Sequence, residues 1–196
     1  MKRAVIAFLL GIFTISGCST GSELAETPEV PSPPSNLQET PNENISELSF
    51  VVNGEAITQP GTLYQSELQR FSMYLLPGYG GHTDSVEKLD MIWNSDSDQE
   101  KIVIKNLGKV DQQQIVDTVK KDLLSKYGFV EEDLSKRNNK FFHNAVILQG
   151  KNAAEKSIVI IGPIMGEIFE IQVNLSTTLI HDEHLFSMIE TIQLVK

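Results

Sequence analysis

One well-delimited helix signal, set between two groups of short alternating apolar runs, most constrains the fold of this chain. Asp111 is placed to cap the free N–H groups of a first helical turn, with Gln114 three residues on as its capping-box partner. Gly128 stands where a left-handed residue commonly ends a helix. Between them, apolar residues recur at spacings of three and four, namely Val116, Val119, Leu123 and Tyr127. The pattern predicts an amphipathic helix that covers another layer of structure.

Before this helix, the sequence predicts a hairpin and three further strands. Asn53-Gly54 lies between Leu48–Val52 and Glu55–Thr58, and Asn-Gly between apolar runs is the strongest short hairpin signal. Three runs with period two follow, each predicting a strand with one buried face. They are Phe71, Met73 and Leu75, then Leu89, Met91 and Trp93, then Ile102 and Ile104. Three neighbouring strands predict an antiparallel meander, with Trp93 in the core.

After the helix, three more strands and a short helix are expected. The strands are Phe141–Leu148, which contains His143, Ser157–Ile161 and Glu167–Leu175, and the helix spans about Asp182–Glu190. The last strand alternates most regularly, with Phe169, Ile171 and Val173 on one side. This order predicts an α+β fold: a largely antiparallel sheet of about six or more strands, with helices packed on it and a hairpin ahead of it.

This order of elements resembles the PsbP, Mog1 and DcrB-like superfamily. The residues that carry the likeness are the strand Phe71-Ser72-Met73-Tyr74-Leu75-Leu76-Pro77, the Trp93 strand, the Ile102–Ile104 strand leading into the Asp111 helix, and the closing Met188-Ile189-Glu190-Thr191-Ile192. The resemblance covers about Leu63 to Val195, so the Asn53-Gly54 hairpin would be an addition. It implies a compact domain, found in bacterial lipoproteins among other places, that acts mainly by binding other proteins.

The N-terminus has the order of an export signal. Met1-Lys2-Arg3 is cationic, and Ala4 to Thr14 is an apolar run too short to cross a bilayer, which takes about 20 residues. Ile15-Ser16-Gly17-Cys18 resembles the lipobox of bacterial lipoproteins. The resemblance implies that residues 1–17 are a signal peptide and that the Cys18 sulfur carries a diacylglyceryl group.

Lipid on Cys18 would place the protein on the extracytoplasmic side of a cell membrane or outer membrane, and Ser19 is not the aspartate that favours inner-membrane retention. Cys18 is the chain's single cysteine, so an intrachain disulfide is excluded and lipidation removes the thiol from any nucleophilic role. Residues 18–44 are rich in Pro, Ser, Thr, Asn and Glu, which predicts a disordered tether. A single globular domain is expected over 45–196.

The charge of the chain argues against a nucleic-acid partner. The formal net charge is −10, and removal of Lys2 and Arg3 with the signal would make it about −12. Such a surface repels phosphate backbones, which are bound by clustered Lys and Arg. Lys136, Arg137 and Lys140 stand among Glu131, Glu132 and Asp133, which is typical of a solvated loop.

Three groups of residues are candidates for binding. Pro77 to His82 is rich in glycine and follows a strand, which fits a contact loop that carries Tyr79 and His82 and fits a flexible connection without a special role equally well. His181 and His184 are spaced to share a metal ion, but the same pattern also fits exposed histidines at a helix start. Asp96, Asp98 and Glu100 resemble the opening of a calcium loop, but the glycine of such a loop is absent, and the pattern favours a charged turn between two strands.

The sequence contains no motif that assigns a catalytic residue or a cofactor. With four scattered histidines and no Gly-x-Ser-x-Gly, spacing alone assembles no catalytic triad. We therefore expect a non-enzymatic envelope lipoprotein that is attached to the membrane through Cys18 and binds a protein partner. The alternative is a lipoprotein that binds a small ligand or a metal ion for a transporter.

Overall fold

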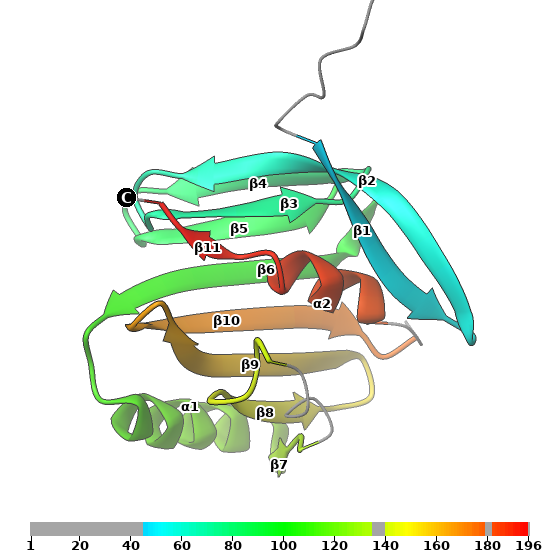
Figure 1. Ribbon diagram of the computed structural model, residues 1–196. Helices are drawn as coiled ribbons and strands as arrows, with labels where there is room; N and C mark the ends of the chain where they lie inside the picture. Colours follow the sequence, from blue (N-terminus) through cyan, green and yellow to red (C-terminus); the bar gives the residue numbers. More distant parts are fainter. Residues whose placement is uncertain (1–44, 135–139, 179–181, 196) are drawn as a thin grey trace, which may run out of the picture. The chain divides into compact units, whose positions relative to one another are not determined.

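The computed structural model describes residues 45–134, 140–178 and 182–195, all of which belong to one compact unit. They form eleven strands and two helices (Figure 1). In chain order these are β1 (Ile45–Val52), β2 (Glu55–Ser66), β3 (Phe71–Leu75), β4 (Tyr79–Asp84), β5 (Leu89–Asn94), β6 (Ser97–Gly108), α1 (Gln112–Tyr127), β7 (Glu131–Glu132), β8 (Val146–Lys151), β9 (Glu155–Ile164), β10 (Glu167–Ser176), α2 (Glu183–Ile189) and β11 (Gln193–Leu194).

The strands form two sheets, and every described strand pair is antiparallel. The four-stranded sheet has the order β1-β2-β3-β11, and the seven-stranded sheet has the order β4-β5-β6-β10-β9-β8-β7. The predicted α+β class with largely antiparallel sheet structure is therefore confirmed.

The N-terminal hairpin is confirmed at the predicted turn. Val52 pairs with Glu55, so Asn53 and Gly54 alone make the turn, with φ angles of 53° and 84°. Two positive φ angles in succession give the turn a twist that matches the two strands it joins. β2 then runs beyond the predicted Thr58 as far as Ser66, and its second half pairs with β3.

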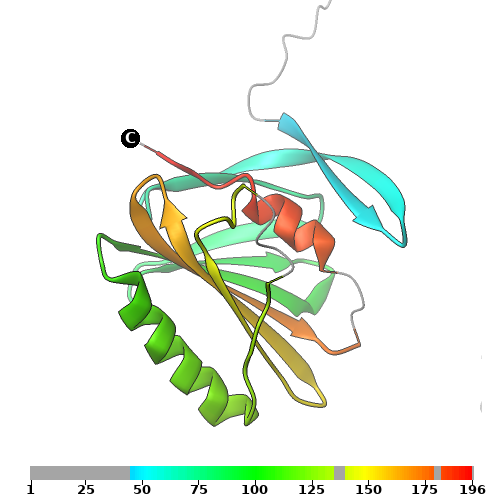
Figure 2. The ribbon, with the colours of Figure 1, turned by 60° about the horizontal axis from the view of Figure 1, so that its bottom comes forward.

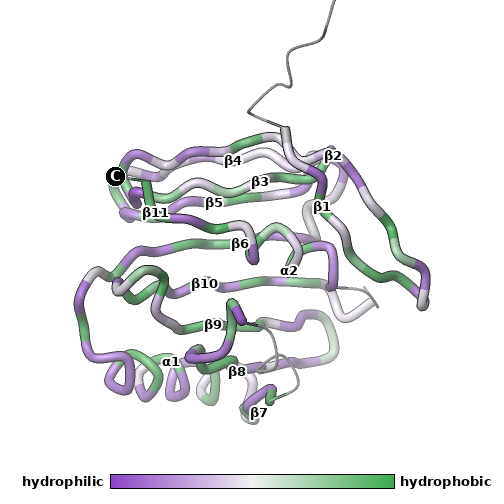
Figure 3. Tube along the Cα trace, in the orientation of Figure 1, coloured by the Kyte–Doolittle hydropathy of each residue, from purple (hydrophilic) through white to green (hydrophobic). Residues whose placement is uncertain are grey.

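The helix predicted at 111–128 is confirmed at both ends. The Asp111 carboxylate accepts a hydrogen bond from the backbone N–H of Gln114, and Gly128 adopts φ 73° with its N–H donating to the Leu124 carbonyl. The turns of α1 show alternating hydrophilic and hydrophobic bands, as an amphipathic helix should (Figure 3). Val116 and Leu123 of the predicted apolar stripe are buried.

Two hydrophobic clusters lie on opposite faces of the seven-stranded sheet. On one face, α1 packs over β8 and β9, where its stripe meets Leu148, Val159 and Ile161 (Figure 2). On the other face, side chains of β5, β6, β9 and β10 form the main core with the four-stranded sheet and α2. The predicted alternation of β10 is confirmed, because Phe169, Ile171 and Val173 are all in the main core.

The predicted meander needs correction. The 71–75 run is β3, which pairs with β2 and β11 in the other sheet, whereas β5 and β6 do pair with each other. The neighbour of β5 on its other side is β4, which pairs with it from Tyr79 to Asp84. The glycine-rich segment predicted as a loop is therefore a strand.

The strand predicted over 141–148 is also shorter than expected. β8 begins at Val146, and residues 140–144 form turns, so His143 lies in a turn and not inside a strand. The apolar pattern here arises because Phe142 and Ala145 enter the main core from the turn. The short helix was predicted correctly to within a residue, with Leu185, Met188 and Ile189 buried.

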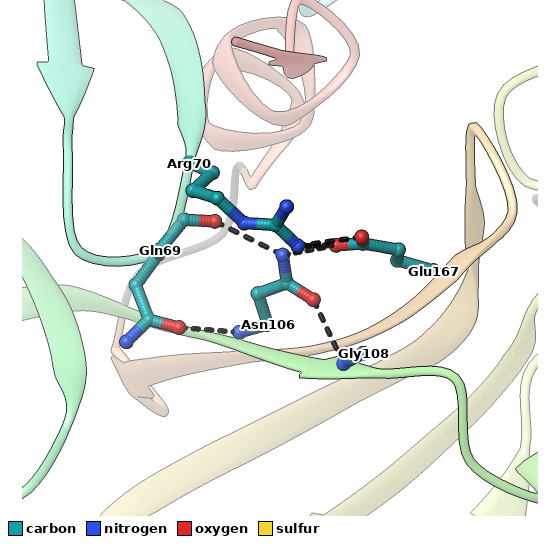
Figure 4. Close-up of polar contacts among 5 residues, drawn as sticks. All are labelled: Gln69, Arg70, Asn106, Gly108 and Glu167. Atoms are coloured by element: carbon teal, nitrogen blue, oxygen red, sulfur yellow. Dashed lines mark hydrogen bonds and ion pairs between the residues drawn. The ribbon is translucent and has the colours of Figure 1, made fainter. Parts of the chain in front are cut away.

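A polar network centred on Asn106 joins the two sheets (Figure 4). The Asn106 side chain donates to the Gln69 carbonyl at 3.0 Å and to Glu167 at 2.7 Å, and it accepts from the backbone N–H of Gly108. Gln69 in turn accepts from the Asn106 backbone N–H, and Arg70 donates to both oxygens of Glu167. One side chain thus ties the β2–β3 connection to β6 and to the start of β10.

The predicted lipid-bearing Cys18, the signal at 1–17 and the tether at 18–44 all lie outside the described residues, so they stay predictions. Over the part of the chain that the structure describes, neither helix combines the length and hydropathy of a membrane span.

Candidate functional site

The side chains of β5 that were expected in the core, those of Leu89, Met91 and Trp93, point away from it. Asp90 and Ile92 are buried, with no exposed surface, while Leu89 and Met91 are half-buried and Trp93 is 39% exposed. The prediction that Trp93 lies in the core is therefore wrong. Period two shows that a strand has two faces, but both faces of β5 carry apolar residues, so the pattern alone did not show which face points inward.

The outward side chains of β4, β5 and β6 form three aligned rows. Strand pairing places Trp93 between Gly80 and Lys101, and Met91 between His82 and Val103. The third row contains the cross-strand pair Asp84 and Leu89, together with Lys105. We call these nine residues the open face: Gly80, His82, Asp84, Leu89, Met91, Trp93, Lys101, Val103 and Lys105.

The open face is the half of the sheet surface that α1 leaves uncovered. Among the described elements, α1 packs on β8 and β9, and α2 packs on β1 and β3. A band of amide and hydroxyl groups on β10 and β9 separates the two halves: Gln172 donates to Ser157 and Asn174, and Ser157 donates to Asn174. An apolar stripe along β5 thus lies beside a helix-covered surface without a helix of its own.

The Trp93 ring lies over Gly80 on this face. Gly80 and Trp93 are cross-strand partners, and a Cβ placed on Gly80 would lie 3.8 Å from Trp93 Cζ2. The indole therefore covers the bare backbone of Gly80 on one side and keeps its other surface in solvent. An exposed tryptophan amid half-buried apolar neighbours is the composition that protein interfaces favour.

Tyr79 and His82, the predicted contact pair, point to opposite faces of β4. His82 is exposed and belongs to the open face, as the cross-strand partner of Met91. Tyr79 points inward, where its hydroxyl donates to the Glu100 carboxylate. A strand alternates its side chains, so residues three apart cannot share a face.

Glu100 and His184, predicted in two separate candidate metal groups, meet in one half-buried cluster with Tyr79. The single proton of the Tyr79 hydroxyl goes to Glu100, so the Tyr79 oxygen accepts from His184 Nε2 at 2.9 Å. His184 Nε2 is also 3.5 Å from Glu100 Oε1, and Asn94 donates to Glu100 at 3.1 Å. The interpretation of Glu100 as part of a charged turn and of His184 as an exposed histidine is wrong, because α2 holds His184 against β4 and β6.

This cluster shifts the pKa of both acidic groups. Burial and the hydrogen bond to Glu100 raise the pKa of Tyr79 well above its ordinary value. Burial alone would raise the pKa of Glu100, but hydrogen bonds from Tyr79 and Asn94 and the nearby His184 outweigh it, so the Glu100 pKa falls below its usual value. The arrangement therefore holds a charged carboxylate and a neutral phenol together at neutral pH.

A second buried carboxylate, Asp90, was not identified from the sequence. It accepts hydrogen bonds from the hydroxyls of Tyr64 at 2.6 Å, Ser66 at 2.7 Å and Thr83 at 2.5 Å. Burial and the Asp90 carboxylate raise the pKa of Tyr64 to about 12. These donors come from β2 and β4, so Asp90 joins the two sheets. Its position between Leu89 and Met91 gave no sign of burial, because its partners are distant in sequence.

An open groove of about 430 Å³ lies at the start of α1. Gln112 spans it, donating to the carbonyls of Asn144 and Ile161 at 3.0 Å each. Asp111 is engaged in capping the helix. The lining residues are Asp111, Gln112, Gln113, His143, Asn144, Ala145 and Val146. The polar side chains of Asp111 and Gln112 in this groove therefore stabilise the fold.

The remaining metal candidates are not brought together. His181 lies outside the described residues, Asp96 is exposed in a turn, and Glu100 points inward to Tyr79. Within residues 45–134, 140–178 and 182–195, no three His, Cys, Asp or Glu side chains are grouped so that they could hold a metal ion.

Comparison with known proteins adds a distant structural likeness. No family model and no curated protein matches this sequence. A crystal structure from Bacteroides thetaiotaomicron VPI-5482 superposes with a TM-score of 0.45 and 15% sequence identity. The superposition covers 69% of this chain and 49% of the other, so this chain spans about half of that protein's length.

Proposed function

We propose that this chain is a membrane-anchored envelope lipoprotein, with a PsbP/Mog1/DcrB-like domain that binds a protein partner through the open face. The lipobox Ile15-Ser16-Gly17-Cys18 supports the anchor and the extracytoplasmic location. The strand that precedes Pro77, the helix capped by Asp111 and the closing helix at Met188 support the domain type.

The observation that carries the binding role is Trp93, 39% exposed on a sheet face that no described helix covers. Tryptophan contributes more than most side chains to binding energy when a partner covers it. The clusters around Glu100 and Asp90 do not support a binding role, because the hydrogen bonds of both carboxylates are made within the protein.

Site-specific photocrosslinking tests the binding role. A photoreactive amino acid replaces Met91 on the open face or, as the matched control, the exposed Leu124 on α1, in the full chain in its own host membranes. We expect a discrete crosslinked protein from position 91 and not from position 124. That protein, once purified, should bind the full chain and lose the binding with Trp93→Ala. Equal products from both positions, or none from position 91, would contradict the proposal.

The anchor has a separate test. Cys18→Ala removes the only sulfur that the lipid could modify, so we expect an uncut precursor that incorporates no labelled fatty acid in the host. Thr20→Ala, a change two residues away, should leave processing and labelling normal. Normal cleavage and labelling of the Cys18→Ala protein would refute lipidation.

A further inference from the structure

The open face has the width of a helix-binding surface. Adjacent strands lie about 4.8 Å apart, so β4, β5 and β6 together present a surface on the order of 14 Å wide. A helix with its side chains is about 10 Å across. The neighbouring half of the same face is already covered by a helix, since α1 lays its apolar stripe on β8 and β9.

The apolar stripe of the open face is bordered by two lysines on β6 and by His82 and Asp84 on β4. Leu89, Met91 and Trp93 form the stripe along β5, with Val103 beside Met91. Lys101 and Lys105 stand on either side of Val103 along β6, and neither takes part in the ion pairs formed among the side chains that the structure describes. Glu170 lies opposite Lys105, and Asn174 lies opposite Lys101. A partner therefore meets an apolar centre with two lysines along its β6 side and with His82 and Asp84 along its β4 side.

Three kinds of occupant meet this face differently. A flat bilayer would touch α1 first, because α1 stands about one helix diameter above the same sheet face. A second copy has no apolar helix side to place on the stripe. Its α1 is already packed against β8 and β9, and its α2 is in the main core. An amphipathic helix from another protein lies beside α1 without obstruction and places apolar side chains on the stripe.

We propose that the open face binds an amphipathic helix of a partner protein, with acidic side chains flanking the helix's apolar face. This inference rests on the proposed protein-binding function and names the class of partner. The helix packs beside α1, covers Trp93 and Met91, and pairs its carboxylates with Lys101 and Lys105. The apolar contact supplies affinity, and the lysines select an acidic helix over a basic one.

Trp93 reports on its own site, because it is the chain's only tryptophan. The full chain is reconstituted in phosphatidylcholine vesicles and titrated with tryptophan-free synthetic peptides. The first is an amphipathic helix with a leucine face flanked by glutamates, the second carries lysines in place of the glutamates, and the third scrambles the first. We expect saturable blue-shifted Trp93 emission with the first peptide, and at least about tenfold weaker binding of the other two.

Matched variants link the signal to the open face. Lys101→Glu with Lys105→Glu should weaken binding of the acidic helix by about tenfold or more, and Met91→Glu should do the same while keeping the reporter. Lys120→Glu with Lys121→Glu makes the same charge change on exposed positions of α1 and should leave binding unchanged. Circular dichroism of each variant checks that the fold is intact.

Each contrary result is distinct. Quenching of Trp93 by brominated phosphatidylcholine before any peptide is added would show that the bilayer occupies the face. A blue shift that follows protein concentration, with dimers in sedimentation, would assign the face to a second copy. Saturation that is equal for the glutamate and lysine helices, or no response to the acidic helix, would also overturn the inference. The photocrosslinking result stands apart, since a partner crosslinked at position 91 would keep the proposed function even if the helix peptide failed.

Discussion

Asp90 shows at the residue scale what a buried carboxylate requires. Three hydroxyls, from Tyr64, Ser66 and Thr83, donate to it, and they lie 26, 24 and 7 residues away in the chain. Without them, burial of this charge would be strongly unfavourable. Asp90 and its donors are therefore one unit, in which the loss of any member leaves buried polar groups without partners.

We expect Asp90→Ala to destabilise the folded state by about 3 kcal/mol, because it leaves three hydroxyls without their acceptor and creates a cavity. The control is Asp96→Ala, which removes an exposed carboxylate in the turn that follows the same strand. It should change stability by less than about 0.5 kcal/mol. Urea unfolding followed by Trp93 emission measures both. A value for Asp90→Ala as small as the control would show that the cluster contributes little.

The two inward tyrosines predict a loss of stability at alkaline pH. Burial and the Asp90 carboxylate raise the pKa of Tyr64 from 10.0 to about 12 in the folded protein. A raised folded pKa gives stability that is complete below pH 10 and is lost as the pH rises from there toward about 12. Urea midpoints measured from pH 8 to 11.5 should fall above pH 10, and less steeply in Tyr64→Phe. A parallel fall in both proteins would remove Tyr64 as the cause.

Glu100 predicts the opposite dependence at acid pH. Its pKa lies below the ordinary value of 4.5, since hydrogen bonds from Tyr79 and Asn94 and the charge of His184 outweigh burial. A lowered folded pKa gives stability that is present above pH 4.5 and is lost as the pH falls through the folded value. Glu100→Gln should therefore flatten the acid side of the stability profile. An unchanged acid limb would assign the acid sensitivity to other carboxylates.

At the scale of elements, the helix at 112–127 depends on local signals more than any other part of the fold. Its first turn is capped by Asp111, and its last turn ends at Gly128 in the left-handed conformation. We expect Asp111→Ala to cost about 1 kcal/mol, because the N–H of Gln114 loses its acceptor. Asp117→Ala on the exposed side of the same helix is the control. Thermal unfolding by circular dichroism compares them, and equal midpoints would mean that the cap is dispensable.

β4 shows an element whose formation depended on contacts outside its own sequence. Glycines at 80 and 81 predicted a loop, yet in the structure each lies against an aromatic ring. The Trp93 ring covers Gly80, and a Cβ on Gly81 would lie only 2.4 Å from Tyr64 Cε2. At Gly81 the lack of a side chain permits the Tyr64 ring of the other sheet to approach β4 closely, a requirement that the local sequence does not reveal.

At the scale of the whole molecule, two polar joints hold the two sheets together beyond their shared core. One is Asp90 with its hydroxyl donors, and the other is Asn106 with Gln69 and Glu167 (Figure 4). Arg70, which also reaches Glu167, has a side chain that is 58% exposed. Each of the two joints should therefore contribute more to the free energy of unfolding than the exposed Arg70–Glu167 ion pair does.

We expect Asn106→Ala to cost about 2 kcal/mol, because its side chain makes three hydrogen bonds, two of which link β6 to the β2–β3 connection and to β10. Arg70→Ala should cost less than about 1 kcal/mol, since exposed ion pairs are screened by water. Adding 1 M salt should reduce the Arg70 effect and not the Asn106 effect. Urea unfolding at both salt concentrations measures this, and a larger cost for Arg70→Ala would reverse the assignment.

The sequence by itself determined the elements that depend on neighbouring residues. The Asn53-Gly54 turn needs two positive φ angles, the Asp111 and Gly128 caps act within one turn, and the alternation of Phe169, Ile171 and Val173 follows from the pleat. Only the tertiary structure decided that Trp93 faces solvent while Asp90 is buried. That choice depends on hydroxyls from β2 and β4 and on the absence of a described helix over β5, and contacts between distant segments leave no trace in a local pattern.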